Sequence, residues 1–162
     1  MVDRRAKKAE KRRKKRDATH RGASNRTASG STALSSTSKA AFIQEAASCP
    51  VGQCYISRNW DAPASPMPSL VMVVLPRSLP HGRIAAGVAM VDRTCIGVKN
   101  GFVTRPLLPR DFDRLLKVQR GALHGGMVPC DLLVAQSIVY HWVDYARRLG
   151  FEPHPDFPER LF

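Results

Sequence analysis

The stretch Leu70–Val91, L-V-M-V-V-L-P-R-S-L-P-H-G-R-I-A-A-G-V-A-M-V, decides the fold of this chain. Leu70–Leu75 is a continuous apolar run rich in β-branched residues, which is typical of a strand buried on both faces. Arg83–Val91 has the same character, and the connection P-R-S-L-P-H-G ends in a His-Gly turn signal. Because a short connection favours antiparallel neighbours, we expect these two strands to pair at the centre of a sheet.

Weaker strand signals lie on either side of this pair. Cys54–Trp60 is expected to form a first strand, and Thr94–Val98 another strand after the central pair. Asn100 and Gly101 form the strongest hairpin turn signal in the chain and should lead into a last strand over Phe102–Thr104. The strands therefore predict an antiparallel β meander.

Helical patterns precede and follow the strands. A short helix is expected over Lys39–Ala47, and a second helix follows Pro109, with apolar residues on one side. A third should run from an N-cap at Asp131 to Leu149, with Gly150 just after its end. The sequence thus predicts an α+β fold with two C-terminal helices.

Composition divides the chain into two parts. Residues 1–38 are basic and then rich in Ser, Thr and Gly, so we expect a disordered basic tail and a linker there. Residues 39–162 should form a single α+β domain. The formal net charge is +13, and residues 1–31 hold twelve Lys and Arg against three acids, which is +9 of that total.

The densest charge lies in Arg4–Arg16, where ten cations occupy thirteen positions and Glu10 is the only acid. Such a run repels itself in water and favours a polyanionic partner such as RNA or DNA. An inert solubilising tail, a nuclear address and a membrane-surface tail are the alternatives. The candidate nucleic-acid-binding residues are Arg4, Arg5, Lys7, Lys8, Lys11, Arg12, Arg13, Lys14, Lys15 and Arg16.

We expect a cytoplasmic protein, or a nuclear one if the source is eukaryotic, with no membrane partner. No apolar stretch is long enough for a transmembrane helix, and the start has no apolar region typical of secretion. The four cysteines should be reduced. Cys49 and Cys54 have the C-x4-C spacing of half a zinc site, but no second compact Cys/His pair follows, so we expect no metal and no cofactor.

Two groups of residues are weak catalytic candidates. Asp92, Cys95 and Lys99 place a carboxylate, a thiol and an amine around a strand junction, although Cys95 is expected in the core. His154 and Asp156, in E-P-H-P-D-F, should project to the same side of an extended segment, which suits general-base chemistry. The simpler interpretation is that this segment fastens the C-terminal region to the body.

A polar row on the last helix is a further candidate. Gln136, Tyr140 and Asp144 recur every four residues and would either line a cleft or form the solvent face. The sequence contains no phosphate-binding glycine loop, H-E-x-x-H motif, G-x-S-x-G motif or dinucleotide fingerprint. The common nucleotide and hydrolase sites therefore lack support.

Two segments, C-I-G-V-K-N at Cys95–Asn100 and Y-A-R-R-L-G-F-E-P-H-P-D-F at Tyr145–Phe157, resemble the signature blocks of an uncharacterised bacterial protein family. The resemblance covers about Cys49 to the C-terminal end and leaves out the basic tail. It implies a small cytosolic α+β domain and no established activity.

The sequence favours a non-enzymatic accessory protein that binds RNA, DNA or a ribonucleoprotein through its basic arm. Because the few aromatic residues form no cluster on a strand, sequence-specific readout is not indicated. A small metal-dependent hydrolase or nuclease acting on nucleic acid, and a protein-interaction domain with an incidental basic tail, are the alternatives.

Overall fold

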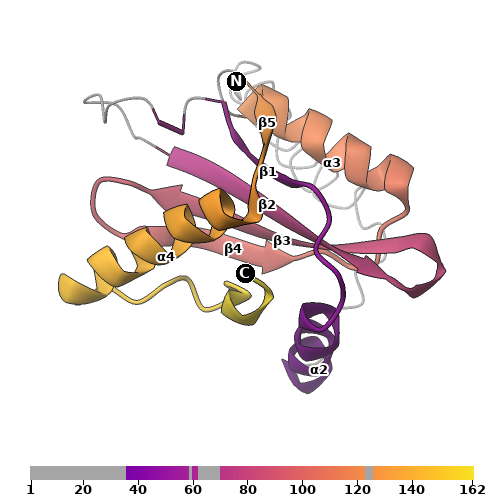
Figure 1. Cartoon of the computed structure of the whole chain (residues 1–162). Coiled ribbons are helices and arrows are strands. Elements are labelled where there is room, and N and C mark those ends of the chain that lie inside the picture. Colours follow the sequence, from indigo (N-terminus) through magenta and orange to yellow (C-terminus); the bar gives the residue numbers. More distant parts are fainter. Residues whose placement is uncertain (1–35, 59, 62–69, 123–125) are drawn as a thin grey trace, which may run out of the picture. The chain divides into compact units, whose positions relative to one another are not determined.

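The computed structural model describes residues 36–58, 60–61, 70–122 and 126–162, and the expected basic tail lies outside them. Ser36–Phe162 form one compact unit. Its elements, in chain order, are α2 (Ser36–Ala47), β1 (Cys54–Ser57), β2 (Leu70–Leu79), the 3-10 turn η1 (Pro80–Gly82), β3 (Arg83–Asp92), β4 (Gly97–Val103), α3 (Pro109–Ala122), β5 (Met127–Cys130), α4 (Leu132–Arg148) and the 3-10 turn η2 (Glu159–Leu161). Figure 1 labels the α-helices and the strands.

The five described strands form one antiparallel sheet in the order β4-β3-β2-β1-β5. The expected central hairpin is confirmed, because β2 and β3 pair along their whole length, from Leu70 opposite Asp92 to Leu79 opposite Arg83. The sheet, the α2 helix and the two helices α3 and α4 confirm the expected α+β fold.

The Asn-Gly hairpin predicted at positions 100 and 101 is wrong. Both residues lie inside β4, where Asn100 pairs with Met90 and Gly101 pairs with Ala89. The chain reverses earlier, over residues 93–96, and β4 begins at Gly97 with a positive φ of 64°. Gly101 is required for a different reason, because Phe157 lies against its backbone.

The strand β5 was not predicted, since its four residues M-V-P-C include Pro129. It pairs with β1 at the edge of the sheet, where Pro129 lies opposite Tyr55. The amide of Arg58 donates to the carbonyl of Gly126, so the alternation of an antiparallel ladder directs the backbone nitrogen of Pro129 away from β1. The proline therefore removes no hydrogen bond from this pair.

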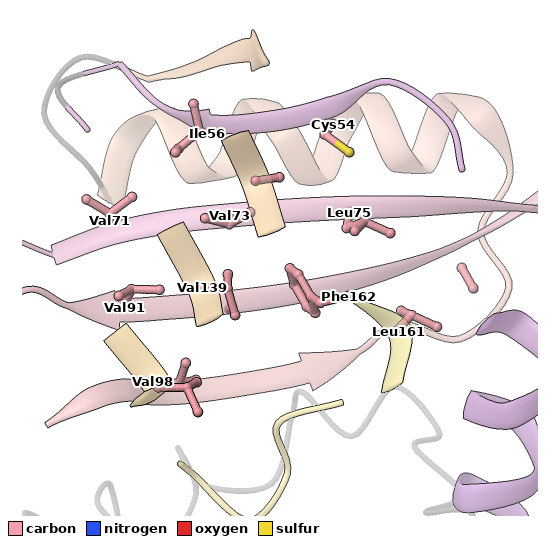
Figure 2. Packing of buried hydrophobic residues seen from close by; sticks show 14 of the residues in the cluster. Cys54, Ile56, Val71, Val73, Leu75, Val91, Val98, Val139, Leu161 and Phe162 are labelled. Carbon is pink, nitrogen blue, oxygen red and sulfur yellow. The ribbon is translucent and has the colours of Figure 1, made fainter. Parts of the chain in front are cut away.

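The central strands have two buried faces, as the apolar run of β2 predicted. Val73 and Leu75 face one cluster with Val139 of α4, shown in Figure 2. Met72 and Val74 face a second cluster with Phe112 of α3. The chain crosses one face through α3 to reach β5 and returns over the other face through α4.

The C-terminal segment completes the cluster under α4. Leu161 and Phe162 are buried there, with 0% and 4% of their surface exposed (Figure 2). They lie over Gly87 of β3, where an added Cβ would come within 2.7 Å of the Leu161 side chain. Two glycines, Gly87 and Gly101, thus leave the space on the sheet that this segment fills.

We predict that Gly101→Ala destabilises the unit by about 1–3 kcal/mol, the usual range for overpacking a core. Its Cβ would stand 3.0 Å from the Cα of Phe157, which is backbone and cannot rotate away. Urea unfolding measures the loss, and hydrogen exchange should show reduced protection of the His154 amide, which donates to the Val98 carbonyl.

Gly82→Ala is the matched control, because Gly82 has a φ of 65° and open space around its Cβ position. It should lose about 1–2 kcal/mol from backbone strain alone and leave the His154 amide protected. Equal exchange at His154 in both variants would contradict the role given to Gly101.

Candidate functional site

Asp92 caps the turn between β3 and β4. Its carboxylate accepts hydrogen bonds from the backbone N–H of Thr94, at 2.8 Å, and from the Thr94 hydroxyl. Burial acts to raise the pKa of Asp92, but these hydrogen bonds, with the backbone of Cys95 and the charge of Lys99, lower it. The carboxylate is thus ionised and used in a local turn.

Cys95 and Lys99 lie on either side of the start of β4. The expectation that Cys95 lies in the core is wrong: its thiol is exposed, because residues 93–96 form the turn and not a strand. Lys99 is an exposed residue of β4, and its charge is the smallest of the causes that lower the pKa of Asp92. The Cys95 thiol and the Lys99 amine therefore lie in the same part of the chain as Asp92, but neither forms a hydrogen bond or an ion pair with its carboxylate.

His154 and Asp156 hold the C-terminal segment in place through separate contacts. The amide of His154 donates to the carbonyl of Val98 at 3.0 Å, along the edge strand β4. The imidazole Nδ1 accepts the backbone N–H of Asp156 at 3.1 Å. The Asp156 carboxylate instead pairs with Lys39 of α2. The expected imidazole–carboxylate pair is therefore not formed.

The hydrogen bond and the charge of Lys39 lower the pKa of Asp156, with a smaller contribution from His154. Since Val98 precedes Lys99, the backbone contact of His154 brings the two groups of catalytic candidates to the same edge of the sheet. Asp92, His154 and Asp156 nonetheless make their hydrogen bonds and ion pair within a turn or in attachment of the C-terminal segment. These contacts fix the C-terminal segment along the β4 edge of the sheet.

The polar row of α4 also contacts the C-terminal segment. Gln136 donates its amide N–H to the carbonyl of Phe162, and the Tyr140 hydroxyl donates to the carbonyl of Glu159 at 3.2 Å. Burial, aided by Glu159, raises the pKa of Tyr140. Only Asp144, the third residue of the row, is exposed. Two of the three predicted row residues are therefore structural.

Arg77 of β2 links the beginning and the end of the unit. Its guanidinium donates to the carbonyl of Leu161 at 2.7 and 3.2 Å and to the carbonyl of Cys49 at 3.1 Å. These bonds supply hydrogen-bond partners to carbonyls that the fold partly shields from water. The sequence gives little sign of this role, because the partners are 28 and 84 residues away.

The cysteines form no metal site within the residues that the structure describes, where no group of three or more His, Cys, Asp or Glu is placed to hold an ion. Cys54 faces Cys130 across the β1–β5 pair. Burial raises the pKa of both thiols, that of Cys130 to about 11 with contributions from Cys54 and Asp131. Both are therefore protonated at neutral pH.

The ten candidate nucleic-acid-binding residues, from Arg4 to Arg16, lie outside the described residues. Sequence reasoning missed another basic feature, the outer side of α3, where Arg110, Arg114 and Lys117 are exposed. Their spacing of four and three residues is visible in the sequence once the helix is placed.

Comparisons with protein-family models, with curated proteins and with solved structures find no match. The family resemblance suggested by the two sequence blocks therefore supports no functional assignment. Among the described helices, none has the length and apolar character required to cross a bilayer.

We predict that the Lys39–Asp156 pair stabilises the unit at neutral pH and not in strong acid. The folded-state pKa of Asp156 lies below its ordinary value of 3.8. Its contribution is therefore complete above the unfolded-state pKa and is lost as the pH falls through the folded-state pKa. Asp156→Asn should lower the free energy of unfolding at pH 7, and the difference from the parent should disappear near pH 2.

Asp144→Asn is the control, because it removes an exposed carboxylate of α4 that forms no ion pair with a described residue. Its effect should be smaller than that of Asp156→Asn at pH 7. Urea unfolding at a series of pH values makes the comparison. A deficit of Asp156→Asn that is the same at pH 7 and pH 2 would show that its charge is not the cause.

Proposed function

We propose that this protein is a non-enzymatic accessory protein that binds RNA, DNA or a ribonucleoprotein through the basic arm Arg4–Arg16. The observation that carries the proposal is the charge density of the arm, ten cations in thirteen positions with one acid. A nucleic acid offers the matching density of negative charge, since a duplex carries one charge for about every 1.7 Å of its axis.

The free energy of such binding comes mainly from the release of counterions. Each phosphate contact adds about 0.7 to the slope of log K against log salt for a single strand and about 0.9 for a duplex. An arm that makes six contacts would thus bind tightly in low salt and weakly in high salt. This mode of binding tolerates any base sequence, in agreement with the absence of an aromatic strand cluster from the sequence.

The contacts of the folded unit favour the accessory protein over the enzyme. Asp92, His154 and Asp156 are engaged in turn and anchoring contacts. Each group keeps lone pairs that these contacts do not use, but no hydrogen bond among the described residues joins an imidazole to a carboxylate, as a general acid–base pair would require. In the proposal the unit is therefore a body that the arm attaches to nucleic acid, in the cytoplasm, or in the nucleus of a eukaryotic source.

The arm is tested in the full chain by replacing Lys11, Arg12, Arg13, Lys14, Lys15 and Arg16 with Gln. Affinity for a fluorescein-labelled 20-nucleotide RNA and for the same DNA sequence should fall at least tenfold, and the salt slope should become shallower. The midpoint of thermal unfolding should remain almost unchanged, because Lys and Arg side chains of a basic run contribute little to a hydrophobic core. Fluorescence anisotropy at several KCl concentrations measures both quantities.

A chain whose residues 4–16 are shuffled is the matched control, since it keeps the charge and composition and should bind as well as the parent. Parental affinity after neutralisation would remove the arm from the binding mechanism. Metal-dependent turnover of the RNA or DNA, absent from an Asp92→Asn variant, would instead support the hydrolase alternative.

A further inference from the structure

The orientation of α3 is fixed by its apolar side. Phe112 is 6% exposed and contacts the ring of Tyr55 edge-on, with a distance of 6.1 Å between ring centroids. Leu115 and Leu116 pack against the same cluster. Just before the helix, the backbones of Ile84 and Leu107 exchange hydrogen bonds of 2.8 and 2.9 Å. The helix therefore has one inner side and one defined outer side.

The outer side carries a row of cations. Arg110, Arg114 and Lys117 follow each other at intervals of four and three residues and are exposed, so they lie on one side of the helix, opposite Phe112. Asp113 lies at the flank of this row, but within the described part of the chain none of the three cations forms an ion pair with it or with another carboxylate.

On the opposite side of the sheet, several cations have partners. Arg147 of α4 lies 3.4 Å from Glu152 and 3.3 Å from Glu159. Lys39 pairs with Asp156, and Arg160 donates to Gln44 at 2.6 Å. Gln44 is neutral, and Arg148 of α4 is exposed with no ion pair to a described residue, so positive charge is not fully compensated on this side either. What distinguishes α3 is that three such cations lie in one row along the helix.

The row also lowers the stability of its own helix. Like charges four residues apart, as in Arg110 and Arg114, cost about 0.2–0.5 kcal/mol in an isolated helix. Arg110 is the second residue of α3, where the helix dipole disfavours a cation. Asp113, which is exposed and lies four residues before Lys117, offsets part of this cost, but three cations against one acid leave the outer side with a net positive charge. The arrangement points to a partner outside the helix.

We propose that Arg110, Arg114 and Lys117 form a second contact surface for the phosphodiester backbone of the nucleic acid that the arm binds. The inference rests on the proposed nucleic-acid-binding function and adds a site on the folded unit. The seven residue steps from Arg110 to Lys117 span about 10 Å of helix, along which a duplex presents about six phosphate charges. The cations are held at fixed positions by the packing of α3, so they set how the body lies on the nucleic acid.

The test compares two full-length variants with the same change in charge. Arg114→Gln/Lys117→Gln removes two cations from the row, whereas Arg148→Gln/Arg160→Gln removes two exposed cations from the side of α4 and the C-terminal segment. Binding to the labelled 20-nucleotide RNA and to a 20-base-pair DNA duplex is measured from 0.05 to 0.5 M KCl.

For the row variant we expect a salt slope reduced by about 1.4 with RNA and about 1.8 with the duplex, and at least tenfold weaker binding at 0.1 M salt. The control should change either quantity far less. Melting temperatures followed by circular dichroism should agree with the parent for the row variant, because the replaced side chains make no core contact.

The outcomes separate the two proposals. If the row variant binds like the control while the arm variant loses binding, the row is not a contact surface and the arm function remains. If the row variant loses binding and the arm variant does not, the row is supported and the arm is not the binding element. Absence of salt-dependent binding by the parent chain would overturn both.

Discussion

Burial of both faces of the β2–β3 hairpin is the constraint on which the rest of this structure depends. Val73 and Val74, neighbours in β2, are both fully buried although their side chains point to opposite faces. An antiparallel sheet with two apolar faces must be covered twice. The unit meets this requirement by sending the chain over one face as α3 and over the other as α4, with β5 added at the edge between the two crossings.

The two covers are built differently, and the difference bears on function. The α3 cover is a single helix attached by an apolar side, so its outer side is free to carry charge that the unit does not need. The α4 cover is shared with α2 and the C-terminal segment, and polar contacts such as Arg77 to Leu161 and Lys39 to Asp156 join these parts. Lys39 and Arg147 form their ion pairs on that side, whereas Arg148 is exposed and has no ion pair with a described residue. The alignment of three cations in one row on α3, none of them paired with a described carboxylate, therefore distinguishes the two sides.

The sequence predicted the features that local patterns determine. The β2–β3 hairpin and the ends of α4, from the N-cap position Asp131 to the positive φ of Gly150, follow from apolar runs and helix-end residues. Asn100 and Gly101 misled, because the glycine is needed for contact with Phe157 and not for a turn. Likewise β5 was not predicted, because Pro129 is unfavourable inside most strands. Among the candidate site residues, Asp156 pairs with Lys39, and local sequence patterns could not predict this pair because 117 residues separate the two.

Mapping the RNA contact on the full-length, isotopically labelled chain by nuclear magnetic resonance tests the central claim most directly. The claim is that nucleic acid meets the basic arm and the outer side of α3, and leaves the α4 side uncovered. Addition of a 20-nucleotide RNA should shift the signals of the arm and of Arg110, Arg114 and Lys117, and those of Arg147 and Arg160 should stay in place. Shifts concentrated on α4 and the C-terminal segment, or no shifts at all, would contradict the account.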